Sequence, residues 1–228
     1  MHGPEGLAEE EQLHTYGHRG GVPEAPENSL QALEQAAQRG YDGVEVDVSR
    51  CRDGLVLFHD RELEGRAIGH WSLAELPAHV PRLADAVDLL ATTRLIANLE
   101  LKLRDPEDLV LLDQSLEIAA PLRGRMLISS FHPKLLRRCA ELAPSVPRGL
   151  AWAPDLPWLL RRPQTWRWSR ATGLHARHDG IDQALVARAR RLGMAVTAWT
   201  AGPEHFERLE ALGVAAVITD DLRPPLRR

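Results

Sequence analysis

Cysteine is scarce in this 228-residue sequence, which contains only Cys51 and Cys139. Two cysteines so far apart exclude a disulfide framework, and they lack the short spacing of a zinc-ligating pair. We therefore interpret both as packing residues. The fold must depend on a hydrophobic core, and a chain of this length buries roughly 70% of its unfolded surface in one domain.

Long hydrophobic runs are also absent. No apolar stretch approaches the roughly 18 residues that a membrane-spanning helix requires. The first residues, MHGPEGLAEEEQ, are acidic and have no apolar centre, so we do not expect a signal peptide. These features predict a cytoplasmic protein that makes no stable membrane insertion.

An excess of positive charge is missing as well. The chain has a formal net charge of −4 and a pI near 6.2. General nucleic-acid binders usually carry a basic patch or stripe, so we expect no nucleic-acid partner. The acidic balance remains compatible with an anionic small-molecule substrate, and the oligomeric state stays open.

Lysine and asparagine are the scarcest polar residues. Arginine supplies nearly every cation, and the chain has only two lysines, Lys102 and Lys134, and two asparagines, Asn28 and Asn98. Such a bias is typical of a GC-rich genome, so the positions that keep these residues are candidates for a specific need. A lysine ammonium is a compact charge that arginine does not always replace.

Two short apolar runs carry polar residues at alternate positions. Residues 44–48 read VEVDV, and residues 96–103 read IANLELKL. Successive side chains of a strand point to opposite faces, so the polar residues of each run share one face. These residues are Glu45 and Asp47 in the first run, and Asn98, Glu100 and Lys102 in the second.

The acidic faces have two interpretations. A surface strand with one wet side shows the same alternation. If both faces look into one cavity, however, Glu45, Asp47 and Glu100 repel one another unless a cation sits between them. The second interpretation predicts a metal site. A set of carboxylates suits one hard divalent cation, Mg²⁺ or Ca²⁺, better than Zn²⁺.

Strand-like and helix-like segments alternate along the whole chain. Eight strands separated by amphipathic helices predict parallel βαβ units closed into a single-domain α/β fold, a (β/α)₈ TIM barrel over residues 1–228. A doubly wound open sheet is the alternative, but no glycine-rich phosphate loop supports it. A stretch rich in Pro and Trp, Pro154 to Trp168, has no assignable pattern. The expected strands cover residues 15–17, 43–48, 95–103, 126–129, 149–153, 174–176, 195–200 and 216–219, and the expected helices cover 30–39, 106–120, 133–142, 182–192 and 204–212.

Active sites of such barrels lie at the C-terminal ends of the strands. His18 and Arg19 follow the first expected strand, and His59 follows an apolar run at residues 55–58. The acidic residues of the second and third strands lie near their C-terminal ends. The sequence therefore predicts that histidines, arginine and carboxylates meet at one end of the barrel.

The string from His18 to Asp60, HRGGVPEAPENSLQALEQAAQRGYDGVEVDVSRCRDGLVLFHD, resembles the N-terminal signature of glycerophosphodiester phosphodiesterases. The resemblance continues through NLELK at 98–102, SSF at 129–131, AWT at 198–200 and VITD at 217–220, and so covers nearly the whole chain. It implies a TIM-barrel hydrolase that uses a metal ion to split a glycerophosphodiester into glycerol 3-phosphate and an alcohol. It further implies metal ligation by Glu45, Asp47 and Glu100, acid–base catalysis by His18 and His59, and phosphate contact by Arg19, with Lys102 also in the site.

The chemistry of these residue types agrees with the roles that the resemblance implies. A cation polarises a phosphoryl oxygen, arginine pairs with phosphate through two hydrogen bonds, and histidine titrates near working pH. Water and the glycerol hydroxyl of the substrate both stay open as the nucleophile. Trp199 is a candidate wall for the leaving alcohol, with core packing as the equal alternative. Asn28 precedes an expected helix, and we predict that it caps that helix.

Some positions depart from the family pattern. Gly202 stands where the family usually has asparagine, and the segment from Asp60 to Leu83 is a short version of the family's insertion, so the headgroup preference stays open. A phospholipase D-like or cyclising phosphodiesterase that acts on a lysophospholipid is the main alternative function. Such an enzyme should expose an apolar lip for membrane contact. A barrel that binds a phosphodiester without turning it over would be expected to lose one of the motif histidines or acids.

Overall fold

The computed structural model describes residues 13–21, 23–105 and 109–220. Eight parallel strands form a ring in the order β1-β11-β10-β9-β8-β7-β6-β2, and pairing of β1 with β2 closes it. The barrel of the (β/α)₈ fold is thereby confirmed. The strands are β1 (His14–His18), β2 (Gly43–Arg50), β6 (Ile96–Leu101), β7 (Met126–Ser130), β8 (Arg148–Trp152), β9 (Gly173–Arg177), β10 (Ala195–Trp199) and β11 (Ala216–Thr219).

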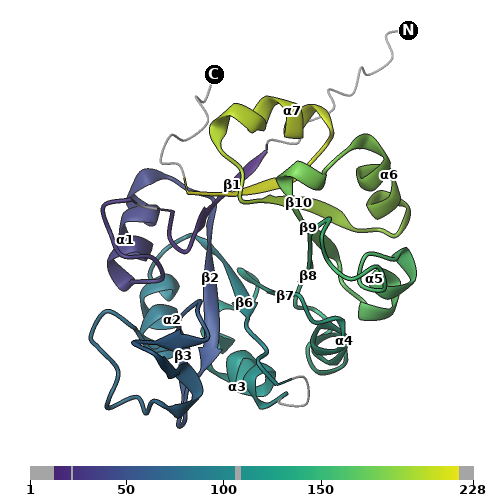
Figure 1. Cartoon of the computed structure of the whole chain (residues 1–228). Coiled ribbons are helices and arrows are strands. Elements are labelled where there is room, and N and C mark those ends of the chain that lie inside the picture. Colours follow the sequence, from purple (N-terminus) through teal and green to yellow (C-terminus); the bar gives the residue numbers. More distant parts are fainter. Residues whose placement is uncertain (1–12, 22, 106–108, 221–228) are drawn as a thin grey trace, which may run out of the picture.

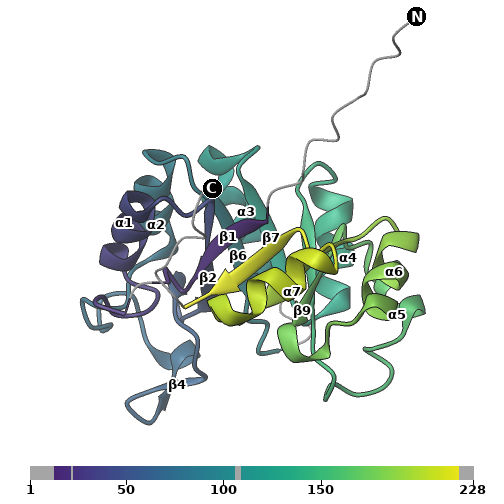
Figure 2. The same ribbon diagram turned by 90° about the horizontal axis from the view of Figure 1, so that it is seen from above.

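Helices surround the ring of strands (Figure 1). Figure 2, turned by 90°, shows the same helices flanking the barrel. The α-helices are α1 (Leu30–Arg39), α2 (Leu83–Ala91), α3 (Val110–Ile118), α4 (Pro133–Leu142), α5 (Pro163–Ser169), α6 (Gln183–Arg191) and α7 (Phe206–Ala211). Short 3₁₀ helices are η1 (Ile68–His70), η2 (Ala120–Leu122), η3 (His178–Gly180) and η4 (Pro203–His205).

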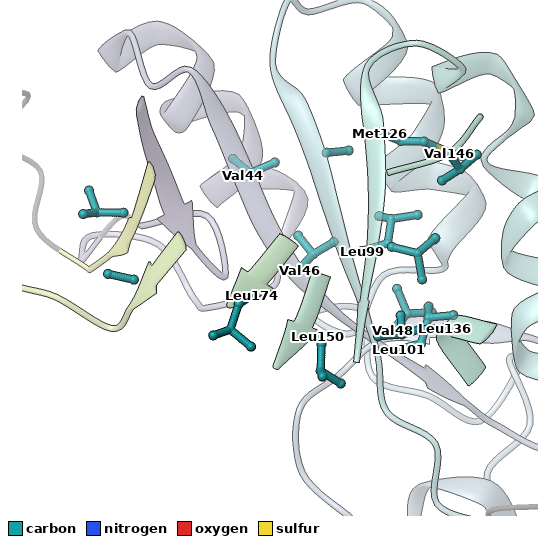
Figure 3. Close-up of a cluster of buried hydrophobic side chains, with 14 of the residues drawn as sticks. Val44, Val46, Val48, Leu99, Leu101, Met126, Leu136, Val146, Leu150 and Leu174 are labelled. Carbon is teal, nitrogen blue, oxygen red and sulfur yellow. The ribbon is translucent and has the colours of Figure 1, made fainter. Parts of the chain in front are cut away.

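The main core lies between the barrel strands and the helices. Val44, Val46 and Val48 of β2 are fully buried in it, as are Leu99 and Leu101 of β6 (Figure 3). These are the apolar positions that alternate with the acidic ones. The alternation therefore sends the valines and leucines to the helices, which leaves the opposite face of each strand for the barrel interior.

A small excursion follows β2 at its C-terminal end. β3 (Leu55–Leu57) runs antiparallel to the end of β2, and the hairpin of β4 (Glu62–Leu63) and β5 (Arg66–Ala67) comes after it. The hairpin projects beyond the barrel (Figure 2). This excursion places His59 beside the end of β2, because the backbone N–H of Phe58 donates to the carbonyl of Asp47 at 2.9 Å.

All eight expected strands are confirmed, including the short one at residues 174–176, which is β9. The five expected helices correspond to α1, α3, α4, α6 and α7, although residues 106–108 of one prediction lie outside the described residues. Glycines follow three of these helices in the left-handed region, with φ of 79° at Gly40, 71° at Gly193 and 77° at Gly213. The prediction missed α2 and α5, and α5 arises within the unassigned Pro- and Trp-rich stretch.

The two cysteines are free and buried, Cys51 under the β3–β5 excursion and Cys139 on α4 in the main core. Burial raises the pKa of the Cys139 thiol to about 11, so it is protonated. Their interpretation as packing residues is confirmed. Among the helices of the described residues, none combines the length and the apolar character needed to span a membrane.

Candidate active site

Strand register brings the predicted site residues together. His18 of β1 is the Cα partner of Glu45, and Asp47 of β2 is the Cα partner of Glu100 on β6. Directly paired residues on neighbouring strands point the same way, so these four side chains converge at the C-terminal mouth of the barrel.

Three carboxylates form an acidic cluster, which we define as Glu45, Asp47 and Glu100. One oxygen from each lies within 4.8 Å of the others. Glu45 and Asp47 are 2% and 1% exposed. The Oε1 atom of Glu45 is buried and has no hydrogen-bond partner among the described residues. Burial, together with the charges of Asp47 and Glu100, holds the pKa of Glu45 well above its usual value. The cluster thus contains an uncompensated buried oxygen of the kind that a cation binds.

Asp47 has several cationic and polar partners. Lys102 Nζ lies 2.8 Å from its Oδ1 atom and also contacts Glu100. Arg19 Nε lies 3.0 Å from its Oδ2 atom, although the N–H is not aligned as a hydrogen bond. Burial alone would raise the pKa of Asp47, but Lys102, Asn28 and Arg19 outweigh it and lower the pKa below its usual value. Asp47 therefore remains ionised beside the less acidic Glu45.

Asn28 does not cap α1, so that prediction is wrong. Ser29 is the cap, and its hydroxyl accepts from the backbone N–H of Ala32 at 3.1 Å. Asn28 is buried at φ 56° and binds Asp47 twice. Its amide Nδ2 donates to Asp47 Oδ2 at 2.9 Å, and its Oδ1 accepts from the Asp47 backbone N–H at 3.0 Å. Asn28 thus positions a carboxylate of the acidic cluster.

We expect replacement of Asn28 to destabilise the protein in two separable parts. Asn28→Gly removes both hydrogen bonds but tolerates positive φ, so it should cost about 1–2 kcal/mol of unfolding free energy. Asn28→Ala adds the strain of an alanine at φ 56° and should cost about 1 kcal/mol more. Urea denaturation of the two variants measures the difference. Equal stabilities would contradict the backbone contribution, and wild-type stability in the Gly variant would contradict the role of the hydrogen bonds.

The turn after β1 holds Arg19 over the cluster. Arg19 has φ 53°, which is uncommon outside glycine, and Gly20 and Gly21 follow it with φ of 100° and 63°. This backbone directs the N–H of Arg19 to Glu45 Oε2 at 3.2 Å, and its guanidinium donates to Glu27 Oε2 at 2.7 Å. The residues HRGG therefore form a turn with positive φ angles. It places the guanidinium of Arg19 between the exposed carboxylate of Glu27 and the buried carboxylate of Asp47.

His18 is oriented by a residue that the sequence analysis missed. Its Nδ1 atom lies 2.6 Å from Oδ1 of Asp220, at the end of β11, and its Nε2 atom lies 4.0 Å from Glu45 Oε2. When the Nδ1 proton is donated to Asp220, Nε2 of the neutral ring is free to accept a proton. Asp220 belongs to the VITD motif, so the signal was present in the sequence, but only the closure of β11 on β1 shows its partner.

A cavity of about 30 Å³ in the barrel interior joins several of these residues. His175 is buried in it, and burial lowers its pKa to about 4, so the imidazole is neutral at pH 7. Trp199 is half-buried, donates its indole N–H to the carbonyl of His175 at 2.7 Å, and packs edge-on against Phe131. The cavity is lined by His18, Glu45, Glu100, Ala151, His175, Trp199 and Ile218.

His59 lies at the rim and not among the residues that line this cavity. Its side chain is 37% exposed, and its Nδ1 atom lies 2.8 Å from Asp60 Oδ1. The guanidinium of Arg104 holds the backbone carbonyl of His59. A larger pocket of about 550 Å³ lies next to Arg104 and Lys102. Arg61, just before the β4–β5 hairpin, and His70, just after it, also line this pocket. His59 thus lies at the rim, and the larger pocket reaches the acidic cluster only through Lys102, which contacts Asp47 and Glu100.

The fold and this site define the class of protein: a (β/α)₈ barrel enzyme whose histidines, cations and carboxylates meet at the C-terminal mouth. The profile of the "Glycerophosphoryl diester phosphodiesterase family" matches residues 18–223, so the chain belongs to that family. Its enzyme class is glycerophosphodiester phosphodiesterase, as the sequence resemblance indicates.

Individual relatives agree with this assignment. The glycerophosphodiester phosphodiesterase of Caldanaerobacter subterraneus is 28% identical, over 90% of this chain and 92% of its own. A phosphodiesterase of Oleispira antarctica, solved in complex with the product sn-glycerol-3-phosphate, is 28% identical with a TM-score of 0.76, over 91% of this chain and 93% of its own. A Parabacteroides distasonis structure, 23% identical with a TM-score of 0.79 over 91% and 92% of the chains, supports the fold.

Proposed function

We propose that this protein hydrolyses glycerophosphodiesters to glycerol 3-phosphate and an alcohol, with one divalent cation held by Glu45, Asp47 and Glu100. The observation that carries the proposal is the acidic cluster, whose buried Glu45 Oε1 has no partner in the described part of the chain. The relative that binds sn-glycerol-3-phosphate supports the same product.

The donor set fits a hard cation. Three carboxylates supply oxygen ligands, and neither a cysteine nor a histidine belongs to the cluster, so Mg²⁺ or Ca²⁺ suits it better than Zn²⁺. When bound, such an ion polarises phosphoryl oxygens and lowers the pKa of a coordinated hydroxyl. Lys102, which contacts both Asp47 and Glu100, adds a second positive charge next to the phosphate position. Arg19 supplies a planar guanidinium for a phosphate oxygen.

Two imidazoles serve the two proton transfers of the reaction. In the tautomer that donates from Nδ1 to Asp220, His18 keeps Nε2 available to accept a proton at the cavity. His59 is oriented in the same manner by Asp60, but it faces the rim. One histidine acts as the base toward the nucleophile, and the other as the acid toward the leaving alcohol. The separation of His18 inside and His59 outside matches the two sides of the scissile phosphorus–oxygen bond.

The alcohol group lies on the outer side of the site. The pocket of about 550 Å³ beside Lys102 provides room for it, and its wall combines Arg61, His70 and Arg104 with apolar residues such as Ile68 and Leu103. Trp199 forms the apolar wall of the inner cavity next to His18. We assign Arg19, Lys102 and Trp199 to substrate binding on the basis of these positions.

The test is an assay of purified protein on glycerophosphocholine, glycerophosphoethanolamine and glycerophosphoglycerol, with phosphorus NMR to identify the products. We expect glycerol 3-phosphate as the product, and a fall in rate of at least about 100-fold on chelation that Mg²⁺ or Ca²⁺ reverses. A rate unchanged by the chelator would contradict the metal requirement. Absence of hydrolysis of all three substrates, with either cation supplied, would contradict the proposed function.

A further inference from the structure

A loop at the edge of the barrel mouth exposes large apolar side chains. We define it as the Trp158 loop, residues 153–162, between β8 and α5. Trp158 is 60% exposed and Leu159 is 54% exposed. Of the five exposed large hydrophobic residues among those that the structure describes, four lie between Leu142 and Trp168. These four residues lie on α4, on α5 and in the loop before α5, and α4 packs against α5.

Positive charge is concentrated in the same region. Residues 133–170 contain eight basic and two acidic residues, whereas the rest of the chain contains 20 basic and 30 acidic ones. Arg148 is buried, but the other basic residues are half-buried or exposed. The neighbouring helices α4 and α5, with the loop before α5, thus carry an excess of positive charge, which Glu141 reduces through ion pairs with Arg137 and Arg138. The basic residues of this α4–α5 surface are Lys134, Arg137, Arg138, Arg161, Arg162, Arg167 and Arg170.

The aromatic and basic groups are interleaved. The guanidinium of Arg162 lies 4.9 Å from the ring centroid of Trp158, and that of Arg137 lies 5.2 Å from the ring centroid of Trp168. Each of these tryptophans has an arginine over its ring, so each pair presents an apolar indole next to a positive charge.

The Trp158 loop is held in place. The hydroxyl of Thr165 donates to the carbonyl of Leu159 at 2.5 Å, and the indole N–H of Trp166 donates to the carbonyl of Leu160 at 3.2 Å. Arg177 at the end of β9 forms an ion pair with Asp155 at 2.9 Å. These contacts fix the backbone that carries Trp158 and Leu159, so their exposure is a built feature of the fold.

The loop lies on the catalytic side of the barrel. It follows β8 at its C-terminal end, and in parallel barrels this end carries the active site. It projects from the same end of the barrel as the β4–β5 hairpin (Figure 2). The Trp158 loop therefore lies near the mouth of the barrel, and α5 leads away from it.

We propose that the Trp158 loop and the basic surface of α4 and α5 bind the face of an anionic phospholipid bilayer. Tryptophan and leucine side chains partition into the interfacial region of a bilayer, where an indole keeps one polar edge in water. Arginines around them are attracted to lipid phosphates and to the negative surface potential of anionic leaflets. The exposed apolar side chains and the arginines lie on neighbouring elements, the Trp158 loop, α4 and α5. Neither group belongs to the active site described above.

Docking of this kind is peripheral and agrees with the lack of stable membrane insertion expected from the sequence. It also locates the apolar lip that a lipid-facing enzyme should expose: the lip lies between β8 and α5, outside the shortened segment at residues 60–83. The docking proposal stands independently of the proposed reaction, because it concerns the adsorption of the chain to lipid.

Sedimentation with lipid vesicles tests the proposal. We expect the wild-type chain to co-sediment with phosphatidylcholine vesicles in which about one lipid in three is phosphatidylglycerol, a composition that sets a strongly negative surface potential. It should bind neutral phosphatidylcholine vesicles much less. Arg161→Gln with Arg162→Gln should lower the partition coefficient about 30-fold, since each arginine near an anionic surface contributes about five- to sixfold. Trp158→Ala with Leu159→Ala should lower it by at least about tenfold.

The matched control is Arg94→Gln with Arg123→Gln, two exposed arginines in connections at the opposite end of the barrel. This variant has the same net charge as the Arg161/Arg162 variant and should bind anionic vesicles like the wild-type chain. All replaced side chains are exposed, so the melting temperatures of the variants should match that of the wild-type chain. Equal binding of all variants would overturn the proposal, as would a wild-type chain that fails to bind anionic vesicles. Binding of a single-stranded oligonucleotide in place of the vesicles would also overturn it.

Discussion

Replacement of His18 by alanine should lower the turnover of glycerophosphocholine by about 100- to 10,000-fold, and replacement of His59 should do the same. His18 bonds an exposed carboxylate, Asp220, and His59 is itself partly exposed, so neither side chain contributes much to the packed core. The loss therefore falls on proton transfer and not on folding. Steady-state rates and thermal unfolding of both variants measure the two effects separately.

His79→Ala provides the matched control, because His79 is exposed on the segment between β5 and α2. It should keep the wild-type rate. A variant of His18 or His59 that retains a near-normal rate would contradict the acid or base role of that residue.

Asp220→Asn should give a smaller loss than His18→Ala, since an amide can still hold the ring but does not stabilise its protonated form.

Glu45→Gln should remove activity while it stabilises the metal-free protein by about 1–3 kcal/mol at neutral pH. Glu45 is buried beside Asp47 and Glu100, and one of its oxygens has no partner in the described part of the chain. Glutamine removes the like-charge repulsion, and its amide can donate to a neighbouring carboxylate. Turnover should fall at least about 100-fold, because Glu45 is one of the three proposed ligands of the cation.

The pH dependence of this difference follows from the raised pKa of Glu45. A carboxyl whose pKa is higher in the folded state than in the unfolded state binds its proton more tightly when folded. The wild type therefore loses stability as the pH rises from the unfolded value, about 4.3, through the folded value. Glu45→Gln lacks this loss, so its advantage should grow from pH 4 toward neutrality.

Chemical denaturation with chelator, at several pH values, measures the effect, and Glu117→Gln on the exposed face of α3 is the control. Cation at 100 times its dissociation constant should remove or reverse the difference, since it stabilises only the protein that binds it, by about 2.7 kcal/mol. A metal-free Glu45→Gln variant that is less stable than the wild type at pH 7 would contradict the account of Glu45.

The strands and most helices were predictable because their signals are local. Alternation of Glu45 and Asp47 with valines identifies β2, and the glycine after each of three helices marks its end. Helix α5 was not predictable in the same way. Its seven residues contain two tryptophans and a proline, and it is stabilised through Trp166, which is fully buried against Trp152. That contact joins residues on different elements.

The role of Asn28 shows a second limit of the sequence. Asn and Ser both favour helix starts, so PENS predicts a cap at either residue. The choice depends on Asp47, 19 residues away, whose carboxylate and backbone both pair with the Asn28 amide. Asp220 gives the same lesson across 202 residues, because only barrel closure brings it to His18.

The sequence by itself determined the eightfold alternation, the family resemblance and the residue types of the site, since side-chain periodicity and motif spacing are properties of neighbouring residues. Tertiary structure alone decided which polar groups meet. The register of β2 with β6 brings Asp47 to Glu100, and the hydrogen bond from Asn28 to Asp47 positions a carboxylate of the acidic cluster. The Trp158 loop likewise became a surface only when the barrel closed. Residues distant in the chain acquire mutual distances, burial and charge interactions only through packing, and the chemistry of a site depends on those three quantities.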